Sequence, residues 1–492
     1  MMKKNVLVIV AAFASLQMQA QRVLQLEDCR QLALSHNKSL QMAKESVKAA
    51  TELKKAAFTQ FLPNFSANGV YTWNQKNISM LGEDAMLPIG TKMADGSFGY
   101  TPGKGQVQET QLANGAWVPL DASGTPFDPR KNPEKLVWKQ YAYLPKEAFE
   151  FDSKNIFVGT IGFTQPIFMG GKIRELYRIS KYSENIAKAK EENEKNELMV
   201  EVDEAYWRVV SVENKLNLAK EYRNLIARMD SNVTNMIEEG VATKAELLKV
   251  KVKLNEAEVM VTKAENGLNL SKMALNQLIG LPLDEAIKLS DTDLSNTKET
   301  KLIPVEQAIS NRPEMKMLTE AQNIAKSSER IMFSRFLPNV ALSGNYLVSN
   351  PNVYDGYENK FGGMFTVGVV ANVPLFHFGE RIHTLNAAKV QAKIAEMKID
   401  ETKEKMQLQI KQDSYKLAES LKKKNTTQQN IDHAEENLRY ASEGFKEGVI
   451  NSTDLLGAQT AWLSAKSENI DAIIDYKLCN SYLAKSLGTV GK

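Results

Sequence analysis

The sequence predicts a mainly α-helical protomer with membrane β-strands, built as a tandem repeat of long coiled-coil helices plus four transmembrane β-strands. Three observations predict this fold class. Motifs recur in the same order at two fixed offsets, 275 and 208 residues. One segment of 67 residues contains neither proline nor glycine, which allows a very long helix. Four segments of about ten residues alternate apolar and polar side chains, the pattern of a tilted membrane strand.

The composition narrows the function classes. The 492 residues carry 62 Lys and Arg against 59 Asp and Glu, a net charge of +3, which does not favour a nucleic-acid partner. Two cysteines exclude a disulfide scaffold or a cysteine-based zinc cluster. The histidines, at positions 36, 377, 383 and 433, lack metal-ligand spacing. No catalytic motif occurs, so we expect no catalytic residues, no metal and no cofactor.

The first 20 residues have the layout of a secretory signal peptide. Lys3 and Lys4 precede an apolar run over residues 6–16, and Ala20 stands at a plausible cleavage point. Eleven apolar residues are too few to span a membrane. The acidic residues before Cys29 do not fit a lipidated cysteine. We therefore expect export without a lipid anchor.

The internal repeat sets the domain organisation. The motif Phe-Leu-Pro-Asn occurs at residues 61–64 and 336–339, an offset of 275. From the Pro-Ile/Leu-Phe motifs at 166 and 374 onward, the offset is 208 without a gap, as at Gly240 and Gly448. The offsets differ by 67 residues, which the first copy carries as an insertion. The predicted parts are a signal peptide (1–20), a first repeat (21–280) with an outer insertion at about 74–155, a linker (281–304) and a second repeat (305–492).

Each repeat is predicted to contain a helix, then a pair of strands, and then a hairpin of two helices. Helices are expected over 26–60, 172–238 and 243–279, and a second-copy helix is expected to begin near Arg381. Apolar residues from Leu198 to Ala219 follow the coiled-coil period. Strands are expected over 65–73, 156–164, 340–348 and 365–373, with Pro166 and Pro374 closing the second strand of each pair.

Helix lengths then suggest an arrangement. The 67-residue helix 172–238 would be roughly 100 Å long, and helices 26–60 and 243–279 roughly 50 Å each. Two half-length helices stacked end to end therefore match one full-length helix. In this arrangement residues 281–304 form a linker at mid-height.

The strands require more than one chain. Four strands cannot close into a barrel, and open strand edges are not tolerated in lipid. Two chains would give a barrel whose lumen is filled by side chains, whereas three chains would give 12 strands around a wider lumen. The same trimer would assemble the helices into a hollow α-barrel continuous with the β-barrel. Such an object is a conduit.

Together, the Leu26–Leu34 segment after the signal peptide, the repeated Phe-Leu-Pro-Asn and Pro-Ile/Leu-Phe-x-x-Gly motifs and the two Gly-Val turns resemble the TolC-type outer membrane factor family (outer membrane efflux proteins). The resemblance covers essentially the whole mature chain. It implies a homotrimer in outer-membrane lipid that extends into the periplasm. Its partners would be a periplasmic adaptor (membrane fusion) protein and an inner-membrane pump, proton-driven or ABC-type. The conduit would be passive in efflux or type I secretion.

A non-transporting periplasmic or surface coiled-coil scaffold is the alternative. A scaffold of this kind has no need of four matched strands. Ion conductance in a bilayer would separate the two. The transported substrate and the pump class are not encoded in recognisable residues.

The two helix turns are the first candidate site. Glycine permits the left-handed conformation that ends a helix, and Thr or Asn caps the next. The resemblance implies that these turns also close the periplasmic entrance and contact the adaptor. The turn residues are Gly240, Val241, Ala242 and Thr243 in the first copy, and Gly448, Val449, Ile450 and Asn451 in the second.

Two carboxylates follow the turns. Asp454 lies six residues after Gly448, and Glu246 occupies the matching place in the first copy. One reading is an ordinary carboxylate in the first turn of a helix. The resemblance implies a periplasmic gate, in which Asp454 forms a ring at the constriction. Gly457 stands where the family can carry a second acidic residue.

The family's closed state can be tied by an Arg or a Tyr near the second turn. Those places hold Ile450 and Phe445 here, so we expect closure to depend on packing or on other residues such as Lys244. Cys29 and Cys479 both fall at mid-height. A disulfide between them is conceivable, but buried thiols are the favoured reading. By position, the insertion is expected to be an extracellular loop, with its aromatic residues giving it some packed structure.

Overall fold

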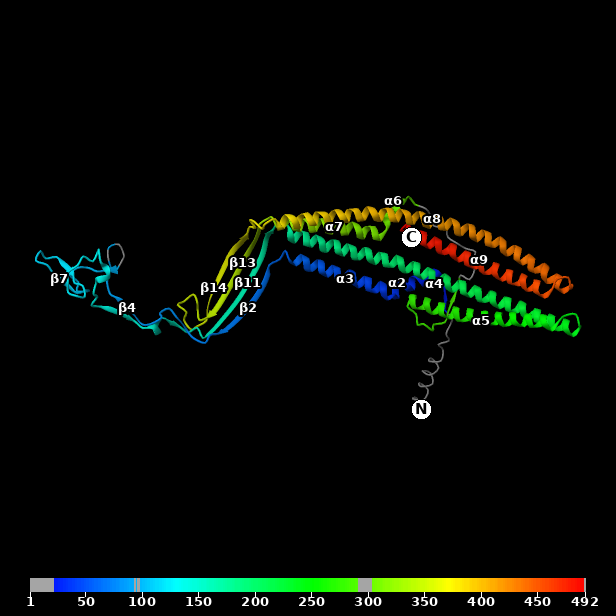
Figure 1. Cartoon of the computed structure of the whole chain (residues 1–492), viewed down its shortest axis with the longest axis horizontal. Coiled ribbons are helices and arrows are strands. Elements are labelled where there is room, and N and C mark those ends of the chain that lie inside the picture. The colour runs from blue at the N-terminus through cyan, green and yellow to red at the C-terminus, as the bar shows by residue number, and fades with distance from the viewer. Residues whose placement is uncertain (1–21, 93, 95–97, 291–302, 491–492) are drawn as a thin grey trace, which may run out of the picture. The chain divides into compact units, whose positions relative to one another are not determined.

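The computed structural model describes residues 22–490 with gaps at 93, 95–97 and 291–302. The predicted signal peptide and half of the predicted linker lie outside the described residues. The chain divides into two compact units (Figure 1). Among the described residues, the helical unit comprises those within 22–59, 170–337 and 374–490, and the strand unit comprises those within 60–169 and 338–373. Each unit thus contains parts of both sequence repeats.

The helical unit is built on two long helices. α4 and α8 have 67 residues each, as predicted for the first copy. The early part of α4 packs against α3 and α7, and its later part packs against α5 and α9 (Figure 1). α8 packs against α7 and α9. The helices are α2 (Leu26–His36), α3 (Lys38–Thr59), α4 (Lys172–Glu238), α5 (Lys244–Ile279), α6 (Val305–Asn311), α7 (Pro313–Ser334), α8 (Glu380–Lys446) and α9 (Ser452–Ser486).

Both copies join their half-length helices in the same way. A Cβ atom placed on Gly280, just after α5, would lie 2.4 Å from the Cβ of His36 at the end of α2. In the second copy, a Cβ on Gly488 would lie 3.1 Å from that of Asn311 at the end of α6. Both glycines have positive φ, +77° and +67°. Glycine is therefore needed here for conformation and for space, and the end-to-end stacking of half-length helices is confirmed.

The predicted continuous helix over 26–60 is wrong at one point. Asn37 is extended and separates α2 from α3. Its side-chain oxygen accepts hydrogen bonds from the backbone N–H groups of Ser39 (2.9 Å) and Leu40 (3.3 Å), and its amide donates to the carbonyl of Leu278. Asn competes for backbone groups in this way, so it starts a new helix. The same break recurs between α6 and α7, before Pro313.

A small parallel ribbon was not predicted. β1 (Arg22–Leu24) pairs with β12 (Ile287–Leu289), which lies inside the segment expected to be only a linker. Leu24, Ile287 and Leu289 are buried in the same hydrophobic cluster as α2, α4 and α5. Three residues are too few for a periodic signal in the sequence.

Buried charges connect the helices near this joint. Arg30 of α2 donates to both carboxylate oxygens of Asp203 on α4, at 2.8 and 2.7 Å. The hydroxyl of Ser481 on α9 donates to the same carboxylate at 2.6 Å. Asp203 is only 2% exposed, so its charge is compensated by a bidentate pair and a hydroxyl.

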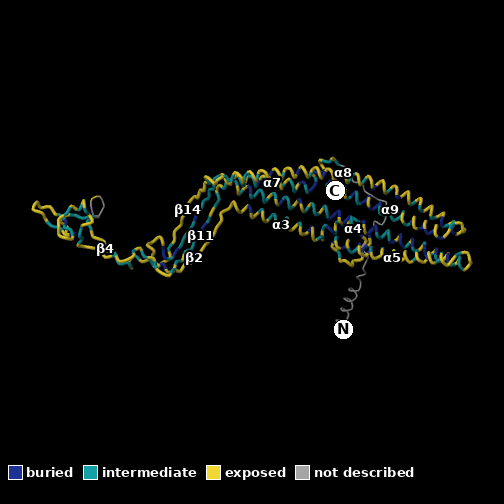
Figure 2. The backbone as a smooth tube through the Cα atoms, in the orientation of Figure 1, coloured by how far each residue is buried: buried dark blue, intermediate teal, exposed yellow. Residues whose placement is uncertain are grey.

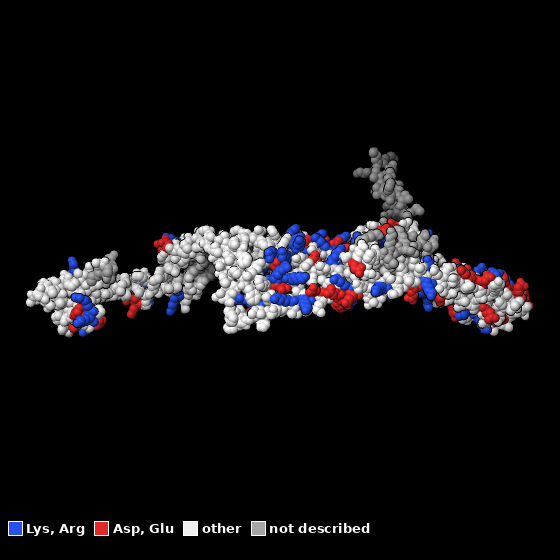
Figure 3. All heavy atoms as spheres, turned by 90° about the horizontal axis from the view of Figure 1, so that it is seen from above, with Lys and Arg blue, Asp and Glu red and all other residues white. Residues whose placement is uncertain are grey.

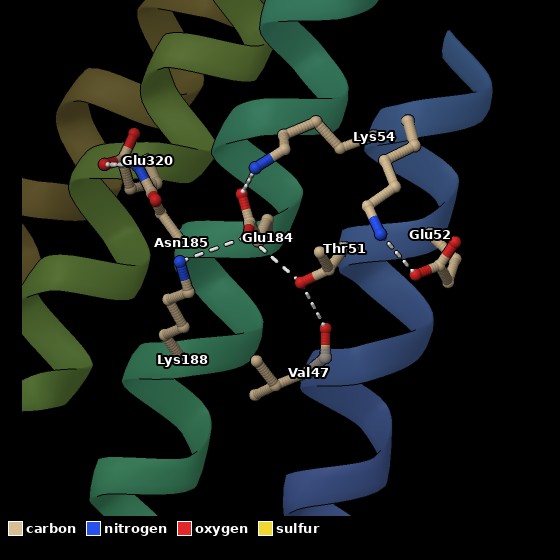
Figure 4. Close-up of polar contacts among 9 residues, drawn as sticks. Val47, Thr51, Glu52, Lys54, Glu184, Asn185, Lys188 and Glu320 are labelled. Carbon is tan, nitrogen blue, oxygen red and sulfur yellow. Dashed lines mark hydrogen bonds and ion pairs between the residues drawn. The ribbon is translucent and has the colours of Figure 1, made fainter. Parts of the chain in front are cut away.

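A second polar cluster lies nearer the start of α4 (Figure 4). The buried carboxylate of Glu184 accepts from Lys54 (2.6 Å) and Thr51 (3.0 Å) on α3, and it pairs with Lys188 at 3.1 Å (Figure 4). The Lys54 bond is the main cause that lowers the pKa of Glu184 to about 2. Glu184 therefore stays ionised and holds α3 in register with α4 at physiological pH.

The hydrophobic core runs between the helices as three clusters rather than one compact centre. Figure 2 shows the buried residues along the inner sides of the helices, with exposed residues along their outer sides. No helix within the described residues is both long and apolar enough to cross a membrane.

The strand unit holds one antiparallel sheet in the order β14-β13-β11-β2. Its strands are β2 (Asn64–Trp73), β11 (Asn155–Met169), β13 (Asn339–Asn350) and β14 (Gly362–Asn372). All four predicted strands are present, and β2 and β14 are the two edges.

Pro166 does not close its strand, contrary to the prediction. β11 continues to Met169, and its register with β13 shifts between Pro166 and Phe168. The pairing of β11 with β2 ends at Thr164, so beyond this residue one side of β11 has no strand beside it. A proline is tolerated at such a free edge or at a bulge because its missing N–H leaves no ladder bond unmade.

The insertion forms short paired strands rather than an unstructured loop. β3 (Ile78–Ser79) pairs with β10 (Glu150–Phe151), and β4 (Ala85–Pro88) pairs with β9 (Tyr141–Leu144). Two further ribbons are β5 (Thr91–Lys92) with β6 (Phe98–Gly99) and β7 (Glu109–Gln111) with β8 (Trp117–Pro119). The 3-10 helices η1 (Pro133–Lys135) and η2 (Lys146–Phe149) complete it.

We predict that Gly280→Ala destabilises the helical unit more than Gly240→Ala. Both glycines have φ of +77°, so both variants lose roughly 1–2 kcal/mol through backbone strain. A Cβ at Gly240 meets nothing within 4 Å, whereas one at Gly280 meets His36. Displacing His36 should cost roughly 1–3 kcal/mol more. Denaturant unfolding followed by circular dichroism measures the difference, and equal losses would contradict the joint.

Candidate functional site

The two helix turns have the same backbone structure. Gly240 and Gly448 have φ of +77° and +74°. The N–H of Val241 donates to the carbonyl of Met236, and that of Val449 to the carbonyl of Gly444, both at 2.8 Å. These bonds complete the ends of α4 and α8 in the Schellman pattern. The helix-ending role expected for both glycines is therefore confirmed.

Both following helices are capped as predicted. The Thr243 hydroxyl accepts from the backbone N–H of Glu246 at 3.3 Å, and the Glu246 carboxylate accepts from that of Thr243 at 2.8 Å. This reciprocal pair is a capping box. Asn451 accepts from the N–H groups of Thr453 and Asp454, both at 2.9 Å.

The two carboxylates differ in their surroundings. Glu246 is half-buried, and the backbone N–H of Thr243 is the main cause that lowers its pKa. The Thr243 and Ser452 hydroxyls add to this lowering. Asp454 is exposed and accepts one bond from the Asn451 amide, at 2.8 Å. Glu246 is thus engaged by its own turn, whereas Asp454 remains accessible to solvent. The gate role of both residues stays a prediction.

Both turns rest on one hydrophobic cluster. Phe445 and Leu455 are buried in it, and Ala242, Leu247 and Ile450 pack against it. The valines at the tips point outward instead: Val241 is 67% exposed and Val449 is 82% exposed. The structure therefore brings the two turns together, with one exposed apolar side chain on each.

A complementary exchange of side-chain size accompanies the duplication. In the first copy, the large Met236 precedes the turn and the small Ala242 follows it. At the matching positions the second copy has Gly444 and the large Ile450. A Cβ on Gly444 would lie 2.9 Å from side-chain carbons of Ile450. The sequence analysis missed this pair, although aligning the two copies at offset 208 places the residues together.

The sheet has two chemically different faces. Residues paired across an antiparallel sheet point to the same side. One such row contains Ala67, Ile161, Tyr346 and Phe365, whereas the next row on the opposite face contains Ser66, Gly162, Asn345 and Thr366. Rings gather on the apolar face, where Phe65 lies 5.8 Å from Phe163 and Tyr71 lies 4.8 Å from Phe157. The aromatic face is exposed: Phe65 is 72% exposed and Phe365 is 61% exposed.

The side chains that could bind a metal ion do not gather among the described residues. No group of three or more His, Cys, Asp and Glu side chains in that part of the chain could hold a metal ion. Cys29 is buried and Cys479 is half-buried, and no disulfide joins them.

A comparison with protein families finds one match. The model of the family described as outer membrane efflux protein matches residues 147–281 and 305–489. No curated protein matches the sequence.

Solved structures show the same fold. The outer membrane protein VceC from Vibrio cholerae is 16% identical, with a TM-score of 0.68 over 94% of this chain and 96% of that one. CusC, whose structures are described as showing conformational changes that accompany folding and transmembrane channel formation, is 13% identical. Its TM-score is 0.71 over 96% of this chain and 95% of that one. The Campylobacter jejuni outer membrane channel CmeC is 17% identical, with a TM-score of 0.68 over 94% and 85%.

We predict that Gly444→Met destabilises the second turn and that adding Ile450→Ala restores it. The single change forces a long side chain against Ile450, which should cost roughly 1–3 kcal/mol. The double change recreates the Met and Ala pair of the first copy. Denaturant unfolding of the single, double and Ile450→Ala variants forms a double-mutant cycle. Additive losses would show that the two positions are independent.

Proposed function

The chain belongs to the outer membrane efflux protein family, and we propose that it is the outer-membrane exit duct of a tripartite efflux or type I secretion system. In this role it passively conducts substrates from an inner-membrane pump across the periplasm and the outer membrane. The observation that carries the proposal is the two-faced sheet with its exposed aromatic side. An exposed apolar face suits lipid, and a polar face opposite to it suits a water-filled lumen.

The free edges of the sheet support a trimer. β2 is exposed along its whole length and β14 along nearly all of it, and neither has an outer neighbour in the described chain. Such edges would leave backbone N–H and C=O groups unpaired in lipid. Pairing β14 of one copy with β2 of the next satisfies both edges. Three copies close a barrel of 12 strands, which is wide enough for a lumen.

The helix turns support a periplasmic gate. We place the exposed Asp454 side chains of the three copies around the trimer axis, where together they attract cations. Glu246 is held by its own capping box, so we assign it the lesser part in the electrostatics of the gate. The packing of Phe445 and Ile450 replaces the charged or hydroxyl bond that these positions cannot make.

We predict that Asp454→Asn lowers cation selectivity. The change removes one exposed negative charge per copy while the cap, made by Asn451, remains. In planar bilayers, the cation-to-anion permeability ratio should fall roughly twofold or more at low salt, because screening is weak there. Asp432→Asn, the same charge change on exposed α8 surface, is the control. An unchanged ratio for Asp454→Asn would refute the gate. Absence of any conductance in the wild type would favour the coiled-coil scaffold.

We predict that the exposed tip valines contact the periplasmic adaptor. A photo-crosslinking residue at Val241 or Val449 should capture the adaptor in cells, because both side chains point into solvent. The same residue at Val390, an exposed position near the start of α8, is the control. Equal capture from all three positions would contradict docking at the turns.

A further inference from the structure

A cluster of three arginines surrounds one buried carboxylate at the start of α4. Glu175 is 1% exposed. Its Oε1 lies 2.8 Å from Arg178 and 3.4 Å from Arg174, and its Oε2 lies 3.5 Å from Arg330 on α7. The guanidinium groups carry three positive charges against one negative charge. The cluster therefore keeps a surplus of positive charge.

The arginines remain accessible although the carboxylate is not. The side chains of Arg174, Arg178 and Arg330 are 65%, 40% and 55% exposed. Each guanidinium has five N–H donors, and Glu175 occupies only a few of them. The buried carboxylate thus fixes one end of each group, and the remaining donors face solvent.

The surrounding surface is basic as well. Residues 172–188 hold five Lys and Arg, and both of their acidic residues, Glu175 and Glu184, are buried. Arg174, Arg178 and Lys181 follow the spacing of one helix face. Figure 3 shows Lys and Arg atoms, with Asp and Glu atoms among them, on the face of the helical unit that is seen from above. The charge that this stretch presents to solvent is positive.

Exposed aromatic residues accompany the arginines. Tyr177, three residues after Arg174, contacts Phe58 with ring centroids 5.9 Å apart. Phe333 follows Arg330 by three residues on α7 and lies 6.2 Å from Phe336. Phe58 and Phe333 are 51% and 52% exposed. Tyr rings beside Lys and Arg, such as Tyr177, are typical of the interface between a membrane and water.

The connections between helices and strands support a position of the arginines at the membrane–water interface. Only two residues separate the end of β11 from the start of α4, and four separate the end of α7 from the start of β13. The arginines are therefore bound covalently, through short segments, to strands that we place in the membrane. Few other positions on the helices lie so near to strand ends in the chain.

We propose that Arg174, Arg178 and Arg330, arranged around Glu175, bind the phosphate groups of anionic phospholipids. Guanidinium groups match phosphate oxygens with paired hydrogen bonds. Glu175 is a positioning residue that holds the three groups together against their mutual repulsion. The inference rests on the proposed membrane position of the strands.

The test uses the full-length protein in vesicles of phosphatidylethanolamine mixed equally with phosphatidylglycerol. After extraction in mild detergent, mass spectrometry measures the retained ratio of the two lipids. Wild type should retain phosphatidylglycerol preferentially. The variant R174Q/R178Q/R330Q should reduce that preference roughly fivefold or more. The control R208Q/R223Q/R228Q makes the same charge change farther along α4 and should keep the preference.

Three outcomes overturn the inference. The first is an equal preference for phosphatidylglycerol in all three proteins, and the second is an equal loss of that preference in both triple variants. The third is a change in anion conductance of R174Q/R178Q/R330Q with unchanged lipid retention, which would place the cluster in the water-filled lumen. Conductance of the wild-type vesicles tests the duct separately: lipid preference without conductance would refute the duct and not the headgroup site.

The variant Glu175→Gln distinguishes a site in which Glu175 orders the arginines from binding by positive charge alone. The substitution raises the net charge of the cluster by one but removes the carboxylate that orders the arginines. If the cluster is pre-organised, phosphatidylglycerol retention should fall severalfold. Unchanged or increased retention would contradict the positioning role. Heat resistance of the helical circular dichroism signal checks that the variant is folded.

Discussion

The fold depends on one geometric constraint: the 67-residue helix α4 must be covered along its whole length by shorter helices, such as α3 with 22 residues and α5 with 36. Two of them must therefore meet end to end, and their ends must stay close without clashing. Gly280 against His36, repeated as Gly488 against Asn311, meets this requirement because glycine has no Cβ and accepts positive φ. Two further contacts lie near the joint: the β1–β12 ribbon pairs the segments before α2 and after α5, and the Arg30–Asp203 pair connects α2 to α4.

Duplication explains the shared elements, and divergence explains the differences. Both turns use the same hydrogen-bond pattern. The large side chain nevertheless precedes the turn in the first copy, as Met236, and follows it in the second, as Ile450. Asp203 is bound by Arg30 in the first copy, whereas Lys411 and Val305 stand at the matching places in the second. Two copies on one chain therefore keep a common backbone while each acquires contacts of its own. This allows one turn to engage its carboxylate and the other to leave it in solvent.

Some of the acidic side chains of α4 are buried, whereas many of their basic partners are exposed. Glu175, Glu184 and Asp203 are buried acids on α4, and each has basic or hydroxyl partners, which come from α4 itself and from neighbouring helices. Because these carboxylates are buried, the basic partners determine what the surface presents. A chain with a net charge of only +3 can thus display a strongly basic surface where α4 begins. The sheet separates its chemistry similarly, with the aromatic rings on one face and most of the polar side chains on the other.

The sequence by itself determined the repeat, the long helices, the four strands and the two capped turns, because these follow from periodicity, proline and glycine positions and capping residues that act locally. Tertiary structure decided the rest. The amide of Asn37, where the helix breaks, bonds Leu278, 241 residues away, and Pro166 stays in a strand because one edge is free. Arg330 reaches Glu175 only when α7 packs against α4. No local pattern records that contact, whereas the size exchange at the turns can be found by aligning the two copies.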